Sequence, residues 1–99
     1  MRTILKLTIP VEAGNQAIKS GRLNAVMEST LGKLRPEASY FYTEHGLRHA
    51  LVVFDLKDPS DIPGIAEPLF MELNAAVDFS PVMNLEDLQK GLAKVQAAV

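Results

Sequence analysis

The sequence predicts an α+β fold in which strands and helices follow the order β-α-β-β-α-β, with one more helix at the C-terminal end. The central evidence is residues 38–55, where two runs rich in aromatic and β-branched residues flank Glu44-His45-Gly46, a pattern typical of a β-hairpin. A helical pattern lies on each side of this hairpin, and a strand pattern lies beyond each helix. A chain of 99 residues has room for one core, so residues 1–99 are expected to form a single domain.

The first and last strands of the chain are predicted from alternating apolar residues. In residues 3–9 every second residue from Leu5 to Ile9 is apolar and faces one side, and Pro10 ends the run. Residues 75–82 alternate in the same way and are expected to form the last strand.

The first helical pattern begins at residues 12–16 and continues as an i, i+3, i+4 apolar stripe to Leu31. It is interpreted as one helix. Gly14 and Asn15 are candidate N-caps of this helix, and Gly21 is expected to be a tolerated glycine in its interior. Gly32 is expected at the C′ position, just after the helix ends.

The second helical pattern covers residues 62–73. Asp58 followed by Pro59 is typical of an N-cap with a proline at the first helical position. Ser60 is an alternative N-cap, which would place Pro63 at the third helical position, where no amide hydrogen is needed. Pro68 is expected to kink or split this helix, since proline removes a helical hydrogen bond, and Asn74 is expected to end it.

A third helix is predicted after residues 84–87, Asn-Leu-Glu-Asp, which have the pattern of a capping box. Its apolar residues form one narrow stripe: Leu85, Leu88, Leu92 and Val95. A short helix with so narrow a stripe is marginal on its own, so we expect it to dock on another surface.

Right-handed crossovers convert the β-α-β-β-α-β order into a ferredoxin-like, four-stranded antiparallel sheet with two helices on one face. The third strand is apolar on both sides, with one set on each face: Leu47, His49, Leu51 and Val53 against Ala50, Val52 and Phe54. A bare apolar sheet face usually marks an interface. The sequence therefore predicts a homodimer that pairs through the sheet face.

Composition excludes several functional classes. The net charge is −2 and no basic stripe is present, which argues against nucleic-acid binding. The chain has no cysteine and only two histidines, so no metal site is expected, and no Gly-rich phosphate loop points to a cofactor. No signal peptide or apolar run long enough to cross a membrane is visible, and a soluble cytoplasmic protein is expected.

The second half of the chain resembles the muconolactone isomerase family in four segments: Leu51-Val52-Val53-Phe54-Asp55-Leu56, Pro59-Ser60, Glu67-Pro68-Leu69-Phe70 and Ala76-Val77-Asp78-Phe79-Ser80-Pro81-Val82. These segments are strand ends, a helix cap and a helix with an internal proline, so they speak for the fold. The resemblance implies membership of the dimeric α+β barrel superfamily, which includes cofactor-free monooxygenases and small uncharacterised bacterial proteins. It further implies a barrel-forming homodimer with a pocket between sheet and helices.

The hairpin carries the candidate catalytic residues. His49 alternates with apolar neighbours on its strand, where an imidazole can serve as a pocket base, although a core or interface histidine satisfied by a neighbour is the more common case. Tyr40 and Tyr42 share one face of the preceding strand. They can line a ligand pocket, or they can pack at an interface with their hydroxyls at its rim.

Other polar residues of the hairpin have simpler interpretations. His45 lies at the predicted turn and is interpreted as a solvated turn residue. Arg48 lies on the face opposite His49, where it can hold a substrate carboxylate, but an ion pair with Glu44 or Asp55 is the favoured interpretation.

Two functional hypotheses follow. The first is a homodimer that binds, or converts without a cofactor, a small apolar or aromatic organic molecule, with His49, Tyr40 and Tyr42 in acid–base and positioning roles. The second is a ligand-sensing or protein-interaction module without catalytic activity. RNA binding through Phe41 is a third option, which the net charge disfavours.

Overall fold

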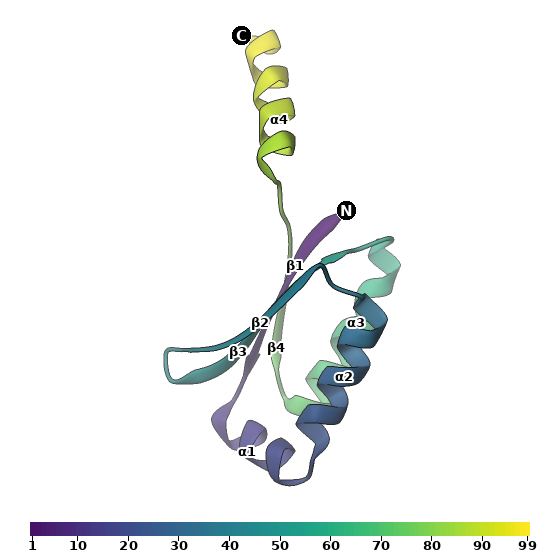
Figure 1. The fold of residues 1–99 in the computed structure, drawn as a ribbon, viewed down its shortest axis with the longest axis vertical. Coiled ribbons are helices and arrows are strands. Elements are labelled where there is room, and N and C mark those ends of the chain that lie inside the picture. Colours follow the sequence, from purple (N-terminus) through teal and green to yellow (C-terminus); the bar gives the residue numbers. More distant parts are fainter.

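A computed structural model of the chain describes residues 1–99. Its elements in chain order are β1 (Arg2–Ile9), α1 (Val11–Lys19), α2 (Arg22–Leu34), β2 (Ala38–Glu44), β3 (Leu47–Asp55), the 3-10 turn η1 (Pro59–Asp61), α3 (Ile62–Leu73), β4 (Ala76–Pro81) and α4 (Leu85–Ala98). The strands form one antiparallel sheet in the order β2-β3-β1-β4, and α1, α2 and α3 lie on one side of it (Figure 1). The predicted α+β fold with ferredoxin-like strand order is therefore confirmed.

The core lies between the sheet and these three helices. Leu5, Leu7 and Ile9 of β1 point toward the helices and are buried, whereas the residues between them are only partly covered. The helices contribute the most completely buried partners, Leu69 and Leu73 of α3. The period-2 pattern of the central strand thus decides which face of the sheet the helices cover.

The predicted hairpin is confirmed, and its turn consists of two residues. Glu44 pairs with Leu47, and His45 and Gly46 between them have φ of 54° and 75°. Two consecutive positive φ values are typical of the type I′ turn, whose twist matches that of the flanking strands. This turn fixes the register that places Tyr42 opposite His49.

The prediction of one long first helix is wrong. The segment forms two helices, and Gly21 lies at the break with φ of 78°, where it is the N-cap of α2. Gly32 is an interior residue of α2, which ends at Leu34 with Arg35 in the left-handed region. An apolar stripe with helical spacing is the same for one helix or two, so the break depends on the backbone at Gly21 alone.

The other helix ends are partly as predicted. The cap of α1 is Pro10 rather than Gly14 or Asn15, which lie inside the helix. Asn74 ends α3 in the left-handed conformation, as expected. The Asp58 side chain accepts a hydrogen bond from the Ser60 amide at 2.9 Å, but it caps the 3-10 turn η1 that precedes α3, and the N-cap of α3 itself is Asp61.

Of the two effects predicted for Pro68, a kink or a split, the split does not occur, because α3 continues through it. Proline at this position removes the amide that would bond to the carbonyl of Gly64. The helix persists because its buried face, formed by Ala66, Leu69 and Leu73, stays packed against the sheet on both sides of the proline.

Arg48 ties α1 to the sheet from the helix side of β3. Its Nη1 donates to the carbonyl of Val11 at 3.2 Å, and its Nη2 donates to Asn15 Oδ1 at 2.9 Å. The expected ion pair with Glu44 or Asp55 is not formed, because Arg48 points to the face of the sheet that α1 covers. Gly14 makes room for this contact, since a Cβ atom there would collide with Nη1 of Arg48.

The C-terminal helix forms with its predicted capping box but does not dock on the rest of the chain. The Asn84 side chain accepts from the Asp87 amide at 2.8 Å, and Asp87 accepts from the Asn84 amide at 3.2 Å. The apolar residues of α4 remain exposed, and the helix projects beyond the end of the sheet (Figure 1). The radius of gyration is 16.1 Å, against about 13 Å for a compact chain of this length.

Replacing Gly14 by alanine is expected to remove the Arg48 contacts, and Gly32→Ala is the matched control because a Cβ at Gly32 meets nothing within 4 Å. Both changes add the same helix preference, so their difference isolates the lost hydrogen bonds. We expect Gly14→Ala to be less stable than Gly32→Ala by about 1–2 kcal/mol in urea unfolding. Equal stabilities would show that Arg48 does not hold α1 to the sheet.

Candidate functional site

The face of the sheet that points away from α1, α2 and α3 carries the candidate residues. We call it the open face. It includes residues from all four strands: Ile4, Lys6 and Thr8 of β1, Tyr40 and Tyr42 of β2, His49, Leu51 and Val53 of β3, and Asp78 of β4. Most of these side chains are partly exposed, because no helix of the chain covers them.

A row of three side chains crosses the open face near the hairpin. Thr8 is paired with His49 in the β1–β3 register, and His49 is paired with Tyr42 in the β2–β3 register. The His49 and Tyr42 rings are stacked, with centroids 5.3 Å apart and an interplanar angle of 17°. The structure thus brings two of the three predicted residues together.

Both ring nitrogens of His49 have a hydrogen-bond partner. Nε2 lies 3.0 Å from the Glu44 carbonyl oxygen, and Nδ1 lies 3.0 Å from the Thr8 hydroxyl oxygen. A carbonyl can only accept, so Nε2–H is the donor there, and Nδ1 of the neutral ring accepts from Thr8. With 8% of the residue exposed, His49 is a fixed aromatic ring held in one orientation.

Tyr40 is the third predicted residue, and the structure separates it from the stacked pair. It is paired with Leu51, two residues along the strand from Tyr42, and is 63% exposed. Its position leaves an apolar ring and a phenol free on the open face, next to Leu51 rather than His49.

A separate pocket of about 310 Å³ lies on the helix side of the hairpin. Its apolar lining includes Leu23 and Met27 of α2 and Phe41 of β2, and it also borders Tyr42 and His49. Because strand residues alternate, the rings of Tyr42 and His49 lie on the open face, opposite the side of Phe41 and Arg48. A ligand in this pocket would therefore contact Phe41, which is 58% exposed, rather than the His49 ring.

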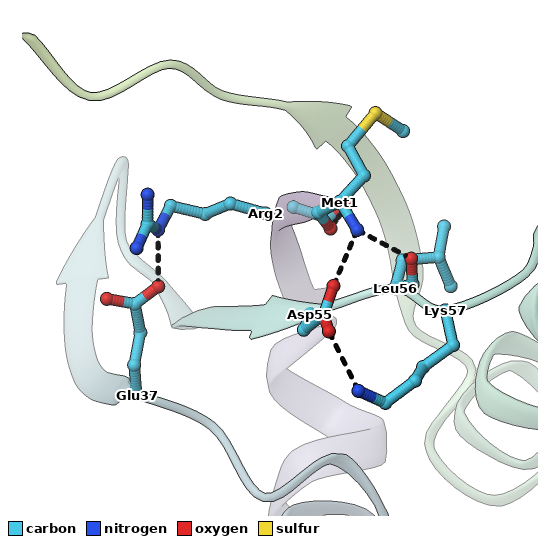
Figure 2. A network of polar contacts seen from close by, with 7 residues as sticks. Met1, Arg2, Glu37, Asp55, Leu56 and Lys57 are labelled. Atoms are coloured by element: carbon cyan, nitrogen blue, oxygen red, sulfur yellow. Dashed lines mark hydrogen bonds and ion pairs between the residues drawn. The ribbon is translucent and has the colours of Figure 1, made fainter. Parts of the chain in front are cut away.

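The remaining polar residues of the hairpin have structural surroundings. His45 is exposed at the turn, with its Nε2 3.4 Å from the Glu44 carboxylate. Asp55 ends β3 and contacts Lys57 Nζ at 2.8 Å and the Met1 ammonium group (Figure 2). The Lys57 ammonium, followed by that of Met1, lowers the pKa of the Asp55 carboxyl to about 2.

Arg2 and Glu37 form a second ion pair close to Asp55 (Figure 2). The Glu37 carboxylate, by hydrogen bond and charge, raises the pKa of the Arg2 guanidinium. This pair joins the first residue of β1 to the segment that leads into β2, so the charges at this end of the sheet have a structural role.

Thr8 is the residue of the site that the sequence interpretation missed. The signal was present, since alternation in residues 3–9 places Thr8 opposite the buried face, and antiparallel pairing with β3 places it beside His49. What was missing was the register between the two strands, which residues 3–9 by themselves do not specify.

No group of three His, Cys, Asp or Glu residues lies close enough to hold a metal ion. None of the helices combines the length and apolar composition that a membrane crossing requires.

Comparison with known proteins supports the fold alone. A crystal structure of a formyltetrahydrofolate deformylase from Pseudomonas putida KT2440 superposes on 83% of this chain with a TM-score of 0.53 and 17% sequence identity. The chain spans 29% of the length of that enzyme. No protein-family profile and no curated protein matches the sequence, so no comparison links it to the muconolactone isomerases that its second half resembles.

The hydrogen bonds of His49 predict its tautomer. We expect the ¹⁵N shifts of the neutral His49 ring to show the proton on Nε2. Thr8→Val should lower the free energy of unfolding by about 1 kcal/mol, because one hydrogen bond to His49 is lost. His45, exposed at the turn, is the internal control. A ring protonated on Nδ1 would contradict this geometry.

The contacts of Asp55 predict its titration. In an NMR titration, the Asp55 carboxyl is expected to titrate near pH 2, and Lys57→Gln should move this value toward the ordinary value of about 3.9. Because the pKa is depressed in the folded state, any stability from this group is present above about pH 4 and is lost as the pH falls through 2. A Lys94→Gln control should leave the titration unchanged.

Proposed function

We propose that the protein is a homodimer that binds a small apolar or aromatic organic molecule on the open faces of its two sheets. The observation that supports this most directly is the Thr8–His49–Tyr42 row, in which the partly exposed Tyr42 ring is stacked on the buried, hydrogen-bonded His49 ring and is thereby held in place on the open face. Tyr40 extends the aromatic surface toward Leu51. Rigid aromatic rings bind flat ligands at a low cost in conformational entropy.

The rest of the open face supports pairing of two copies. Ile4, Leu51 and Val53 form an apolar centre on the two middle strands, and no element of the same chain covers it. Apolar surface of this kind usually marks an interface or a binding site. Two such faces placed together would shield the apolar centres and enclose the aromatic rows, as in a dimeric α+β barrel.

The hydrogen bonding of His49 favours binding over proton transfer. Both of its nitrogens are engaged, by Thr8 and by the Glu44 carbonyl, so neither is free to take a proton from a ligand in this state. A cofactor-free, isomerase-like or monooxygenase-like conversion would require one of these bonds to open. In that case Thr8 is the partner to release, because its hydroxyl can rotate.

A ligand-sensing module without catalytic activity is the second candidate function. It is supported by the hydrogen bonds to both His49 nitrogens, which leave neither nitrogen free for proton transfer. In this version the ligand, for instance an amino acid, would shift the association of the protein instead of being converted. Lack of turnover of any bound compound would favour this alternative.

The proposal is tested by thermal unfolding in the presence of aromatic acids, lactones and amino acids. A compound that binds at a concentration 100 times its Kd should stabilise the protein by about 2.7 kcal/mol through mass action. We expect His49→Ala and Tyr40→Ala to reduce this stabilisation by ligand. His45→Asn is the matched control, because it changes the other histidine of the hairpin while retaining a residue that tolerates positive φ.

Two results would contradict the proposal. One is a ligand-induced shift that survives both His49→Ala and Tyr40→Ala but is lost in Phe41→Ala, which would move the site to the helix-side pocket. The other is a monomeric mass in sedimentation velocity with and without ligand, which would remove the dimer.

A further inference from the structure

The most prominent unexplained feature of the molecule is the exposed apolar stripe of α4. Leu85, Leu88, Leu92 and Val95 are between 41% and 67% exposed, and Val99 beyond the helix is 97% exposed. The helix projects from the end of the sheet and lies away from the three helices that cover it (Figure 1). An isolated helix of 14 residues is marginal in water, so this stripe needs a partner.

The connection between β4 and α4 is short. The amide of Val82 still donates to the Arg2 carbonyl at 3.1 Å, which holds the chain to the sheet. The capping box then starts at Asn84, so Met83 is the one residue between the sheet and the helix. This arrangement directs α4 outward, where a second molecule can reach its stripe.

The spacing of the stripe is that of a helix–helix seam. Its four residues are separated by 3, 4 and 3 positions, which are the a and d positions of a heptad, and Val99 follows 4 positions later. A stripe restricted to these positions is typical of a coiled coil. The flanking e and g positions are uncharged: Gln89, Gly91, Gln96 and Ala98. An identical helix can therefore approach without placing like charges beside the seam.

The charges of α4 favour an antiparallel orientation. Glu86 and Asp87 lie in the first turn, whereas Lys90 and Lys94 lie further along, and Glu86 contacts Lys90 of its own helix at 3.4 Å. These charges occupy positions outside the seam, so they act along the helix axis and not as contacts across the seam. An antiparallel pair centred on Lys90 places the acidic first turn of one helix level with Lys94 of the other, whereas a parallel pair places the two acidic first turns side by side. The antiparallel alignment places Leu85 level with Val95 and Leu88 level with Leu92.

We infer that α4 pairs antiparallel with α4 of a second copy of this chain through the seam formed by Leu85, Leu88, Leu92 and Val95. This interface is separate from the open face and does not rest on the proposed ligand-binding function. It covers the stripe of both copies at once and brings the acidic end of each helix to the basic part of the other.

The first test measures the mass of the assembly by sedimentation equilibrium. We expect the wild-type mass to be at least twice that of the 10.8 kDa chain, and Leu88→Glu/Leu92→Glu to lower it at least twofold. Ala93→Glu/Ala97→Glu adds the same charge on the outer side of α4 and should keep the wild-type mass. Folding of the body is verified by the circular dichroism and thermal unfolding of each variant.

The mass measurement also separates the two proposals. Leu51→Glu, on the open face, should abolish the stabilisation by ligand. In the same variant the α4 pair should persist, so that adding Leu88→Glu/Leu92→Glu still lowers the mass. A monomeric wild type, or a seam variant with the full wild-type mass, would overturn the α4 interface. A seam variant that keeps the full wild-type mass is expected if α4 instead folds onto the sheet of its own chain.

The second test determines the orientation by cross-linking, which is simplified because the chain contains no cysteine. Leu85→Cys mixed with Val95→Cys should form a disulfide between the two variants under mild oxidation. Leu85→Cys alone should not, because antiparallel pairing separates the two copies of residue 85 by roughly 15 Å, beyond the Cα separation of about 7 Å that a disulfide allows. Efficient cross-linking of Leu85→Cys with itself would overturn the antiparallel pair.

Discussion

The constraint on which the rest of the structure depends is the alternation of β1, the strand that pairs with both β3 and β4. It buries Leu5 and Leu7 beneath the helices and leaves Lys6 and Thr8 on the open face. Since the side-chain period of a strand is two, a shift of one residue would exchange these faces completely. The position of every candidate residue on β3 and β2 follows from this register.

The candidate site is a direct consequence of that register. His49 meets Thr8 across β1 and Tyr42 across β2, so its two hydrogen bonds and its stacking partner come from three positions in the sequence. The same pairing turns Arg48 to the helix side, where it contacts the carbonyl of Val11 and Asn15. One strand thus places His49 on the open face and Arg48 on the helix side.

The small core explains why two apolar surfaces of this chain remain uncovered. Only 15 of the 99 residues are buried, so the domain leaves the open face and the α4 stripe without an intramolecular partner. Small domains bury a smaller fraction of their surface than large ones and often gain stability through association. Two separate self-interfaces would make the assembly depend on protein concentration, and a ligand at the open face would then favour the associated form.

The amino-acid pattern by itself determined the strands, the hairpin and the capping residues Asp58, Asn74 and Asn84, because each depends on residues close together in the chain. The type I′ geometry of the hairpin turn is seen only in the backbone of His45 and Gly46. The pattern also placed the two tyrosines on one face of their strand, whereas the register between β2 and β3 places His49 on the same face of the sheet. The passage of α3 through Pro68 was decided by tertiary packing. The break between α1 and α2 was decided by the left-handed backbone of Gly21, which an apolar stripe with helical spacing does not reveal. Only the register between distant strands gave His49 its partners, and only the direction of the chain after Val82 left α4 exposed, because both arise from contacts that no local pattern encodes.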